Sequence, residues 1–279
     1  MKRTHRWAAA ILVCALACAG VSGLAQSAPA PEEVTFTSGT LTLHGLLWKP
    51  AGAGPFPALL YSHGSGKPVR LPAKLGPAFA SHGYVFFLPH RRGHGLSADQ
   101  APYMSDVLDA ERKTHGTASW SRLLVKMHET DHLNDTIAAL AYLKTRQEVN
   151  VAKMAIAGCS FGGIQTVLVA ERELGVKAAV DFAGAAMTWT DSPDMRRRMT
   201  EAVGRAKVPI YFAQAENDYN LGPSRTLSAE MKRLGKPYEM KIFPPFGTTK
   251  EDGHGGFCYS GAEAWGPDVF AFLSRTLGT

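Results

Sequence analysis

Short apolar runs typical of β-strands alternate with longer helical patterns along this chain of 279 residues, and this alternation most limits its fold. Helical spacing of apolar residues predicts helices over 133–143 and in the segment that follows residue 160. Alternating strands and helices predict an α/β fold, with a mostly parallel sheet covered by helices on both faces. The predicted strands are residues 34–37, 41–48, 58–61, 84–88, 154–157, 178–182, 209–213 and 238–243.

The composition is that of a folded globular chain. Hydrophobic residues make up 45% of the chain, which excludes a disordered protein, and the 28 glycines follow no fixed period, which excludes collagen. Four cysteines are too few for a disulfide scaffold of this length.

The first 25 residues resemble a secretory signal peptide. Lys2, Arg3 and Arg6 precede an apolar run over residues 7–19, and small residues follow it up to Ala25. Cleavage after Ala25 would leave a single catalytic domain over 26–279, periplasmic or secreted, with no stable membrane span. The alternatives are a retained membrane anchor and a lipid anchor on Cys18. Loss of the three basic residues lowers the formal charge from +6 to +3, which is too small for a nucleic-acid groove.

Cys159 and Cys258 remain after cleavage of the expected signal peptide. In an oxidising compartment such a pair can form a disulfide. Each can equally be a buried small side chain, and the sequence leaves both possibilities open.

The segment 158–162 reads Gly-Cys-Ser-Phe-Gly and has the G-x-S-x-G form. It directly follows a predicted strand and precedes a helical pattern, which is the setting of a nucleophile elbow. Glycines on both sides of Ser160 allow a sharp turn without clashes from a Cβ. Ser160 is therefore the candidate nucleophile.

A serine nucleophile needs a base, and the base needs a carboxylate. Asp218 follows the predicted strand 209–213 and is the favoured acid, with Glu216 as its rival and Asp181 as a more distant one. His254 lies in a glycine-rich loop after the last predicted strand and is the only histidine after His132. Asp218 and His254 therefore complete the candidate triad.

An acyl-transfer site also needs N–H donors for the oxyanion. The residue after the nucleophile, Phe161, supplies one candidate donor. The loop after the strand 58–61 reads His63-Gly64-Ser65-Gly66, and Ser65 is the second candidate, with Gly64 as the alternate.

A competing motif lies at 128–132, where His-Glu-Thr-Asp-His matches H-E-x-x-H. On one helix the two histidines would share a face and bind zinc, with Glu129 as the base. No further ligand follows in a recognisable frame, so the favoured interpretation is a polar helix start without a metal.

Five motifs carry a resemblance that spans about residues 34–275: HGSG at 63–66, RGHGLS at 92–97, GCSFG, Asp218, and GHGGF at 253–257. Together they resemble the α/β-hydrolase superfamily and, within it, the dienelactone hydrolase family. The resemblance implies an eight-stranded sheet, a serine-type triad, hydrolysis of a small-molecule ester or lactone, and no metal or organic cofactor. In the name-giving enzymes the nucleophile is cysteine, so the mechanism class is expected here but their dienelactone substrate is not carried over.

Two segments, 98–128 and 187–205, fit the alternation of strands and helices poorly and are expected to be small lid-like insertions near the site.

Two alternative functions stay open. One is a peptidase of the same fold, and the other is a non-catalytic binding module built on it.

Overall fold

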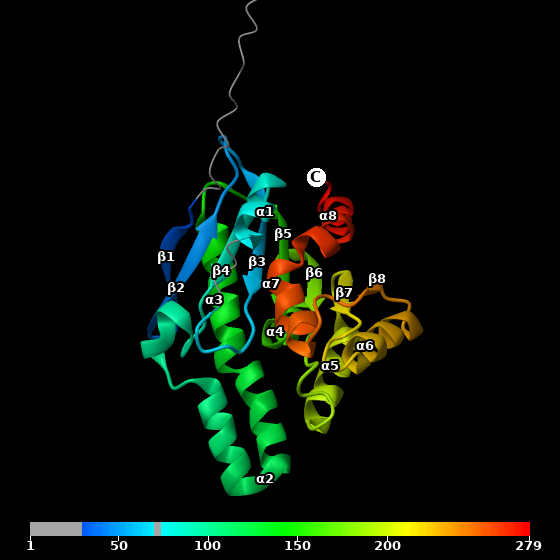
Figure 1. Cartoon of the computed structure of the whole chain (residues 1–279). Helices are drawn as coiled ribbons and strands as arrows, with labels where there is room; N and C mark the ends of the chain where they lie inside the picture. Colours follow the sequence, from blue (N-terminus) through cyan, green and yellow to red (C-terminus); the bar gives the residue numbers. More distant parts are fainter. Residues whose placement is uncertain (1–29, 70–73) are drawn as a thin grey trace, which may run out of the picture.

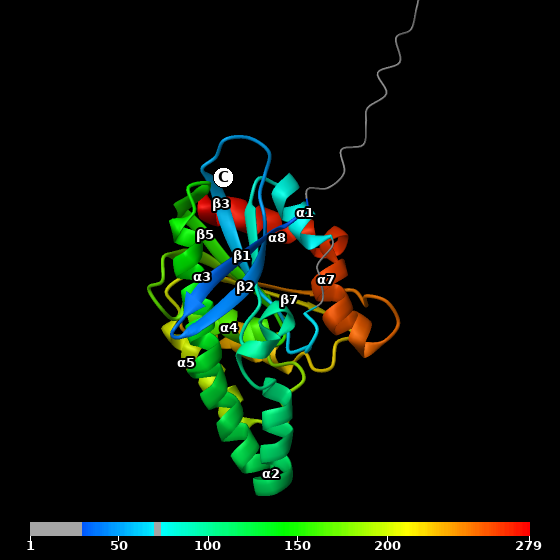
Figure 2. The ribbon, with the colours of Figure 1, turned by 90° about the vertical axis from the view of Figure 1, so that its left-hand side faces the viewer.

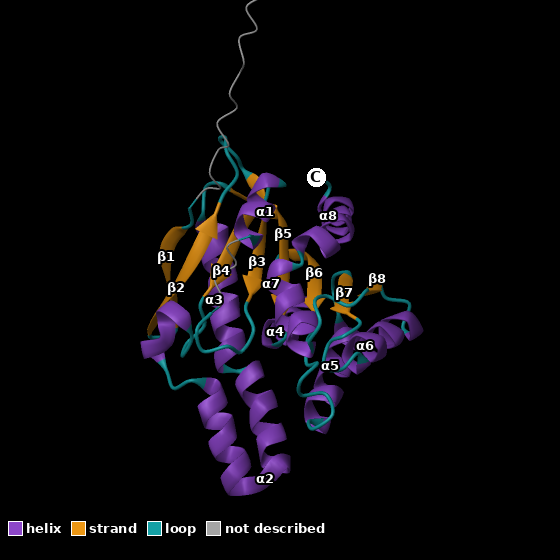
Figure 3. Ribbon diagram, viewed as in Figure 1, coloured by secondary structure: helices purple, strands orange, loops and turns teal. Residues whose placement is uncertain are grey.

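The computed structural model describes residues 30–69 and 74–279, and the expected signal peptide lies outside these residues. Eight strands form one sheet in the order β1-β2-β4-β3-β5-β6-β7-β8 (Figure 3). The strands are β1 (Glu32–Ser38), β2 (Leu41–Trp48), β3 (Phe56–Ser62), β4 (Val85–Pro89), β5 (Val149–Cys159), β6 (Val176–Phe182), β7 (Ile210–Ala215) and β8 (Tyr238–Phe243). All eight predicted strands are confirmed.

The sheet is mixed but mostly parallel. Strand β2 pairs antiparallel with both β1 and β4, whereas β3 to β8 run parallel to one another. Because parallel strands end at the same edge, the loops after β3, β4, β5, β6 and β7 gather at one end of the sheet. This end carries the candidate site residues.

Helices cover both faces of the sheet (Figure 2). Helices α3 to α6 pack on one face, and α1, α7 and α8 pack on the other. The helices are α1 (Leu75–Ser81), η1 (Gly95–Gln100), α2 (Met104–Glu129), α3 (Asp131–Thr145), α4 (Phe161–Ala170), α5 (Pro193–Arg205), α6 (Gly222–Arg233), η2 (Asp252–Gly256), α7 (Phe257–Ser260) and α8 (Ala262–Leu277). Among the described residues, no helix combines the length and the apolar character needed to cross a bilayer.

The central strands are apolar along their whole buried length because both of their faces meet helices. In β5, Met154 and Ile156 join the core under α3 to α6, while Ala155 and Ala157 join the core under α1 and α8. This explains why the strands read as continuous apolar runs rather than as alternating ones.

The expected insertion over 98–128 forms the end of η1 and nearly all of α2. Helix α2 is a hairpin of two helical arms that meet at Gly116, whose φ of 79° lies in the region that favours glycine. The hairpin projects from the end of the sheet where the parallel strands finish (Figure 1). The second segment, 187–205, contains α5 and a loop that includes Met187.

Candidate active site

The turn between β5 and α4 holds Ser160 in an unusual backbone conformation. Its φ of 56° lies in the left-handed region that side chains rarely adopt. The Ser160 N–H donates to the Phe182 carbonyl at 2.8 Å and so ties the turn to β6. A Cβ added at Gly158 would lie 2.2 Å from the Gly162 oxygen, and one added at Gly162 would lie 1.8 Å from the Ser62 oxygen. The turn is thus the glycine-dependent bend that the sequence predicts.

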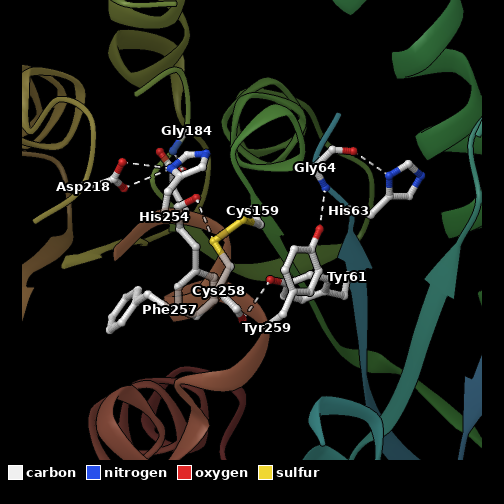
Figure 4. Close-up of a disulfide and its surroundings, with 12 residues drawn as sticks. Tyr61, His63, Gly64, Cys159, Gly184, Asp218, His254, Phe257, Cys258 and Tyr259 are labelled. Carbon is white, nitrogen blue, oxygen red and sulfur yellow. Dashed lines mark hydrogen bonds and ion pairs between the residues drawn. A yellow bond between two sulfur atoms is a disulfide. The ribbon is translucent and has the colours of Figure 1, made fainter. Parts of the chain in front are cut away.

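Asp218 lies in the loop after β7, and His254 lies in the short helix η2 rather than in the predicted loop. The two side chains come together at the candidate site (Figure 4). The His254 Nδ1 lies 2.9 and 3.1 Å from the two carboxylate oxygens of Asp218. Both side chains are buried. The His254 Nε2 is also buried and has no hydrogen-bond partner among the described residues. A carboxylate on Nδ1 favours the tautomer that leaves Nε2 as an acceptor.

The two rival acids are placed elsewhere. The Glu216 N–H donates to the Phe243 carbonyl at 2.9 Å, and the carboxylate partner of His254 is Asp218. Asp181 is fully buried within β6, and its Oδ1 accepts the Gly184 N–H at 2.8 Å. Burial raises the pKa of the Asp181 carboxyl to about 7.

Asn217 connects the acid loop to the histidine loop, and sequence reasoning did not single it out. Its Nδ2 donates to the carbonyls of Phe246 and Thr249 at 2.9 and 2.8 Å, and its Oδ1 accepts the Phe246 N–H at 2.9 Å. These three bonds hold Phe246 and Thr249, which lie just before η2, against Asn217, the residue that precedes Asp218. An asparagine directly before the candidate acid was the only signal for this role in the sequence.

The candidate oxyanion donors flank Ser160. Phe161 begins α4 directly after it, and Ser65 lines the same two cavities as Ser160. The alternate donor, the Gly64 N–H, donates to the Tyr259 hydroxyl at 2.8 Å (Figure 4). Because this bond occupies the Gly64 N–H, Ser65 is the better placed of the two loop donors.

Arg91 holds the 63–66 loop by hydrogen bonds to its carbonyls. Nothing in the sequence indicated this role of Arg91. Its guanidinium is buried and donates to the carbonyls of His63 and Gly64 at 2.9 and 3.1 Å and to the Ser62 hydroxyl at 2.9 Å. It also lies 4.2 Å from the Phe161 ring centre. Among the described residues no carboxylate lies within ion-pair distance of Arg91, and burial lowers its pKa to about 9. A buried cation therefore contacts the loop that leads to Ser65 and the ring of Phe161.

The H-E-x-x-H residues do not share one helix, so the zinc alternative lacks its helix and the favoured polar helix start applies only from Asp131 onward. Helix α2 ends at Glu129, Thr130 has non-helical backbone angles, and α3 begins at Asp131. Glu129 pairs with Arg198 instead of facing a ligand site. The His128 ring stacks on Phe161 with ring centres 3.9 Å apart. Within 30–69 and 74–279, no group of three or more His, Cys, Asp or Glu side chains is arranged to hold a metal ion.

Cys159 and Cys258 form a disulfide, which resolves the alternative left open by the sequence (Figure 4). It joins the residue before Ser160 to α7, four residues after His254, across a sequence separation of 99. The bridge thus ties the turn of the candidate nucleophile directly to the segment that follows the candidate base.

We expect loss of this bridge to destabilise the protein strongly. Closing a loop of 99 residues restricts the unfolded chain by about 4 to 5 kcal/mol. The variant Cys159→Ala/Cys258→Ala should show this loss in urea unfolding curves, with a lower kcat from the freed His254 segment. Dithiothreitol should reproduce the loss in the natural chain and leave the double variant unchanged. Equal stability with and without the reductant, after thiol titration shows full reduction, would contradict this expectation.

Five buried histidines cluster around Arg91 and Phe161: His63, His90, His94, His128 and His132. Burial lowers the pKa of each, and the positive charge of Arg91 lowers it further. The pKa values of His90 and His94 fall to about 4. All five are therefore neutral in the folded protein at pH 7.

The folded protein should accordingly lose stability in mild acid. A lowered histidine pKa stabilises the fold above the unfolded value near 6.5, and this stabilisation is lost as the pH falls toward 4. Between pH 6.5 and 5, His90 and His94 together should cost about 3 kcal/mol. Asp181 acts in the opposite direction, because its raised pKa favours folding at low pH and this contribution disappears as the pH rises through 7. It offsets about 2 kcal/mol of the loss, and the other three histidines add to the loss.

Urea unfolding at pH 6.5 and 5 tests this balance. The natural chain should be less stable at pH 5, and Asp181→Asn should be more acid-sensitive because the offset is gone. The exposed Asp99→Asn is the matched control and should follow the natural chain. Equal stability at both pH values in all three proteins would contradict the assignment.

A cavity of about 400 Å³ contains the site. Ser160, His254 and the 63–66 loop line it together with Tyr259. His254 and the candidate nucleophile therefore line one cavity. The cavity opens at the carboxyl ends of the parallel strands, where this architecture places ligands.

Comparison with known proteins places this geometry in context. The profile of the Dienelactone hydrolase family matches residues 46–265. The uncharacterized peptidase YtmA of Bacillus subtilis is 25% identical over 253 residues, covering 78% of this chain and 88% of that protein. The polyketide transferase grgF of a Penicillium species is 28% identical over 225 residues, covering 76% of this chain and 68% of that protein.

Solved structures share the fold at low sequence identity. The acylaminoacyl peptidase of Pyrococcus horikoshii is 18% identical with a TM-score of 0.64, and the match covers 88% of this chain but 42% of the peptidase. This chain thus spans less than half the length of that enzyme. A Klebsiella pneumoniae protein assigned to the dienelactone hydrolases is 14% identical with a TM-score of 0.62, covering 89% of this chain and 98% of that one.

Proposed function

The chain belongs to the dienelactone hydrolase family, and from this premise we propose that it is an exported serine hydrolase of carboxylic esters or lactones. The observation that carries the proposal is the Asp218–His254 pair, in which Nε2 has no hydrogen-bond partner among the described residues and His254 lines one cavity with Ser160. These are the parts that a serine acyl-transfer mechanism requires.

In the proposed mechanism Ser160 Oγ attacks the ester carbonyl carbon while His254 Nε2 takes the hydroxyl proton. Asp218 holds the imidazole and stabilises its positive charge. The N–H groups of Ser65 and Phe161 donate to the oxyanion that forms. Collapse of the tetrahedral intermediate breaks the bond to the alcohol, which receives the proton from His254. Water then attacks the acyl-enzyme by the same route and releases the acid.

Arg91 contributes to the oxyanion site without touching the substrate. Its bonds to the carbonyls of His63 and Gly64 hold the loop that carries Ser65. Its buried positive charge favours negative charge developing above Phe161, because charges interact strongly where water is excluded. Arg91 is therefore a positioning residue in this proposal.

The specific alternative is a peptidase, which the description of YtmA and the acylaminoacyl peptidase fold both favour. Hydrolysis of p-nitrophenyl butyrate and of butyryl p-nitroanilide separates the two, because the substrates share an acyl group and differ in the bond cleaved. Because a nitrophenyl ester is intrinsically far more reactive than a nitroanilide, the decisive observation is whether the anilide is cleaved at all. We expect the natural chain to hydrolyse the ester but to cleave the anilide no faster than Ser160→Ala does. Cleavage of the anilide by the natural chain that Ser160→Ala loses would favour the peptidase.

Export is a second part of the proposal. It is supported by the basic residues and apolar run before Ala25 and by the Cys159–Cys258 bridge, since stable disulfides are typical of oxidising compartments. N-terminal sequencing of protein recovered outside the cytoplasm should begin at Gln26. Recovery of the natural chain from the cytoplasm with residues 1–25 attached would contradict this part.

A further inference from the structure

A second cavity adjoins the nucleophile on the side of the α2 hairpin. It has a volume of about 260 Å³. Its apolar lining comes from both arms of α2 and from α4, and includes Met104, Leu108, Trp120, Leu124 and Ile164. We refer to this cavity as the apolar chamber. Many of its lining residues belong to the segment 98–128, which fitted the alternation of strands and helices poorly.

The apolar chamber and the larger cavity meet at the nucleophile. Ser65, Ser160 and Met187 line both spaces. His254 lines the larger cavity only, whereas Phe161 lines the apolar chamber only. A substrate bound across Ser160 would therefore place one part on the His254 side and the other part beside α2.

The position of His254 determines which part of an ester lies on each side. His254 must deliver a proton to the leaving alcohol, so the alcohol has to lie on its side. The acyl group then extends from Ser160 toward α2. On the basis of the proposed function, we propose that the apolar chamber binds the acyl group, and that the substrates are esters of an uncharged apolar acid with about six to nine carbons.

The size and charge of the apolar chamber set these limits. If each carbon takes about the ~30 Å³ of a water molecule, a space of about 260 Å³ holds roughly eight or nine carbons. Among the described residues that line it, none is lysine or arginine, and Asp109 is present. A second carboxylate on the acid would therefore find no cationic partner there and would meet an anionic one. Each buried methylene should strengthen binding about fourfold until the chamber is full.

The test is a chain-length profile with p-nitrophenyl esters from acetate to dodecanoate. The natural chain should show kcat/KM rising to a maximum near hexanoate to octanoate and then falling. Ser105 lies on α2, is half-buried and lines the apolar chamber, so Ser105→Trp should fill it without disturbing the core. We expect this variant to lower the octanoate-to-acetate ratio of kcat/KM about tenfold or more, since a blocked chamber loses the contribution of several methylenes. The control is Ala110→Trp, at an exposed position on the same arm that does not line the apolar chamber, and it should keep the natural profile.

A flat profile, or a Ser105→Trp profile parallel to that of the natural chain, would overturn the acyl assignment while ester hydrolysis itself stands. Calorimetric titration of Ser160→Ala with octanoate and with acetate gives a readout that is independent of turnover. Binding of octanoate over acetate that Ser105→Trp removes and Ala110→Trp keeps would support the apolar chamber even if no ester is hydrolysed. In that case only the proposed hydrolase function fails. Equal binding of both acids would overturn the apolar chamber as an acyl site.

Discussion

Replacement of Ser160 by alanine should lower kcat for p-nitrophenyl butyrate roughly 10⁴-fold or more. The reason is that the proposed acyl-enzyme cannot form without Oγ, whereas the oxyanion donors and both cavities stay in place. His254→Ala should cause a loss of similar size. The double variant should lose no more than either single one, because triad members act as a unit.

Purified variants with matched folding are needed for this comparison. Ser228 is a buried serine on α6 whose hydroxyl donates to the Arg225 carbonyl, so Ser228→Ala controls for the loss of a buried hydroxyl. It should keep kcat within about twofold, because it changes no group placed in the site. Full turnover by Ser160→Ala would exclude Ser160 as the nucleophile.

Asp218→Asn is expected to reduce kcat by about 10⁴-fold with little change in KM. An amide keeps the shape of the side chain but can donate to Nδ1, which favours the wrong imidazole tautomer, and it cannot stabilise the charged ring. Steady-state kinetics across pH 6 to 9 measures this directly.

Glu216→Gln is the matched control, because it makes the same chemical change two residues away in the same loop. Since Glu216 does not pair with His254, its kcat should stay within about twofold of the natural value. A large loss in Glu216→Gln together with normal kinetics in Asp218→Asn would reverse the assignment of the acid.

The sheet could be predicted from the sequence because each central strand is buried on both faces and reads as an apolar run. Residues 154–157 show this, although β5 extends from Val149 to Cys159. The extra residues were missed because Val151 and Ala152 are exposed and Lys153 is half-buried, so periodicity gives no signal there.

A site residue could be predicted only where the residues next to it in the sequence indicate its role. The glycines that the turn requires indicate Ser160, and the position after the last strand indicates His254. The roles of Asn217 and Arg91 depend on hydrogen bonds to carbonyls that are 29 and 28 residues away along the chain, so composition and spacing could not show them. The H-E-x-x-H segment, interpreted as one polar helix start, is divided between two helices at Thr130, and residue spacing does not reveal such a break.

The most direct test of the proposed nucleophile is labelling with a fluorophosphonate probe at pH 8, read by intact mass and by peptide mapping. The natural chain should gain one adduct, on Ser160. Ser160→Ala and urea-unfolded protein should gain none, and His254→Ala should react far more slowly. Absence of labelling in the folded natural chain, or an adduct on another residue, would contradict the proposed serine hydrolase mechanism.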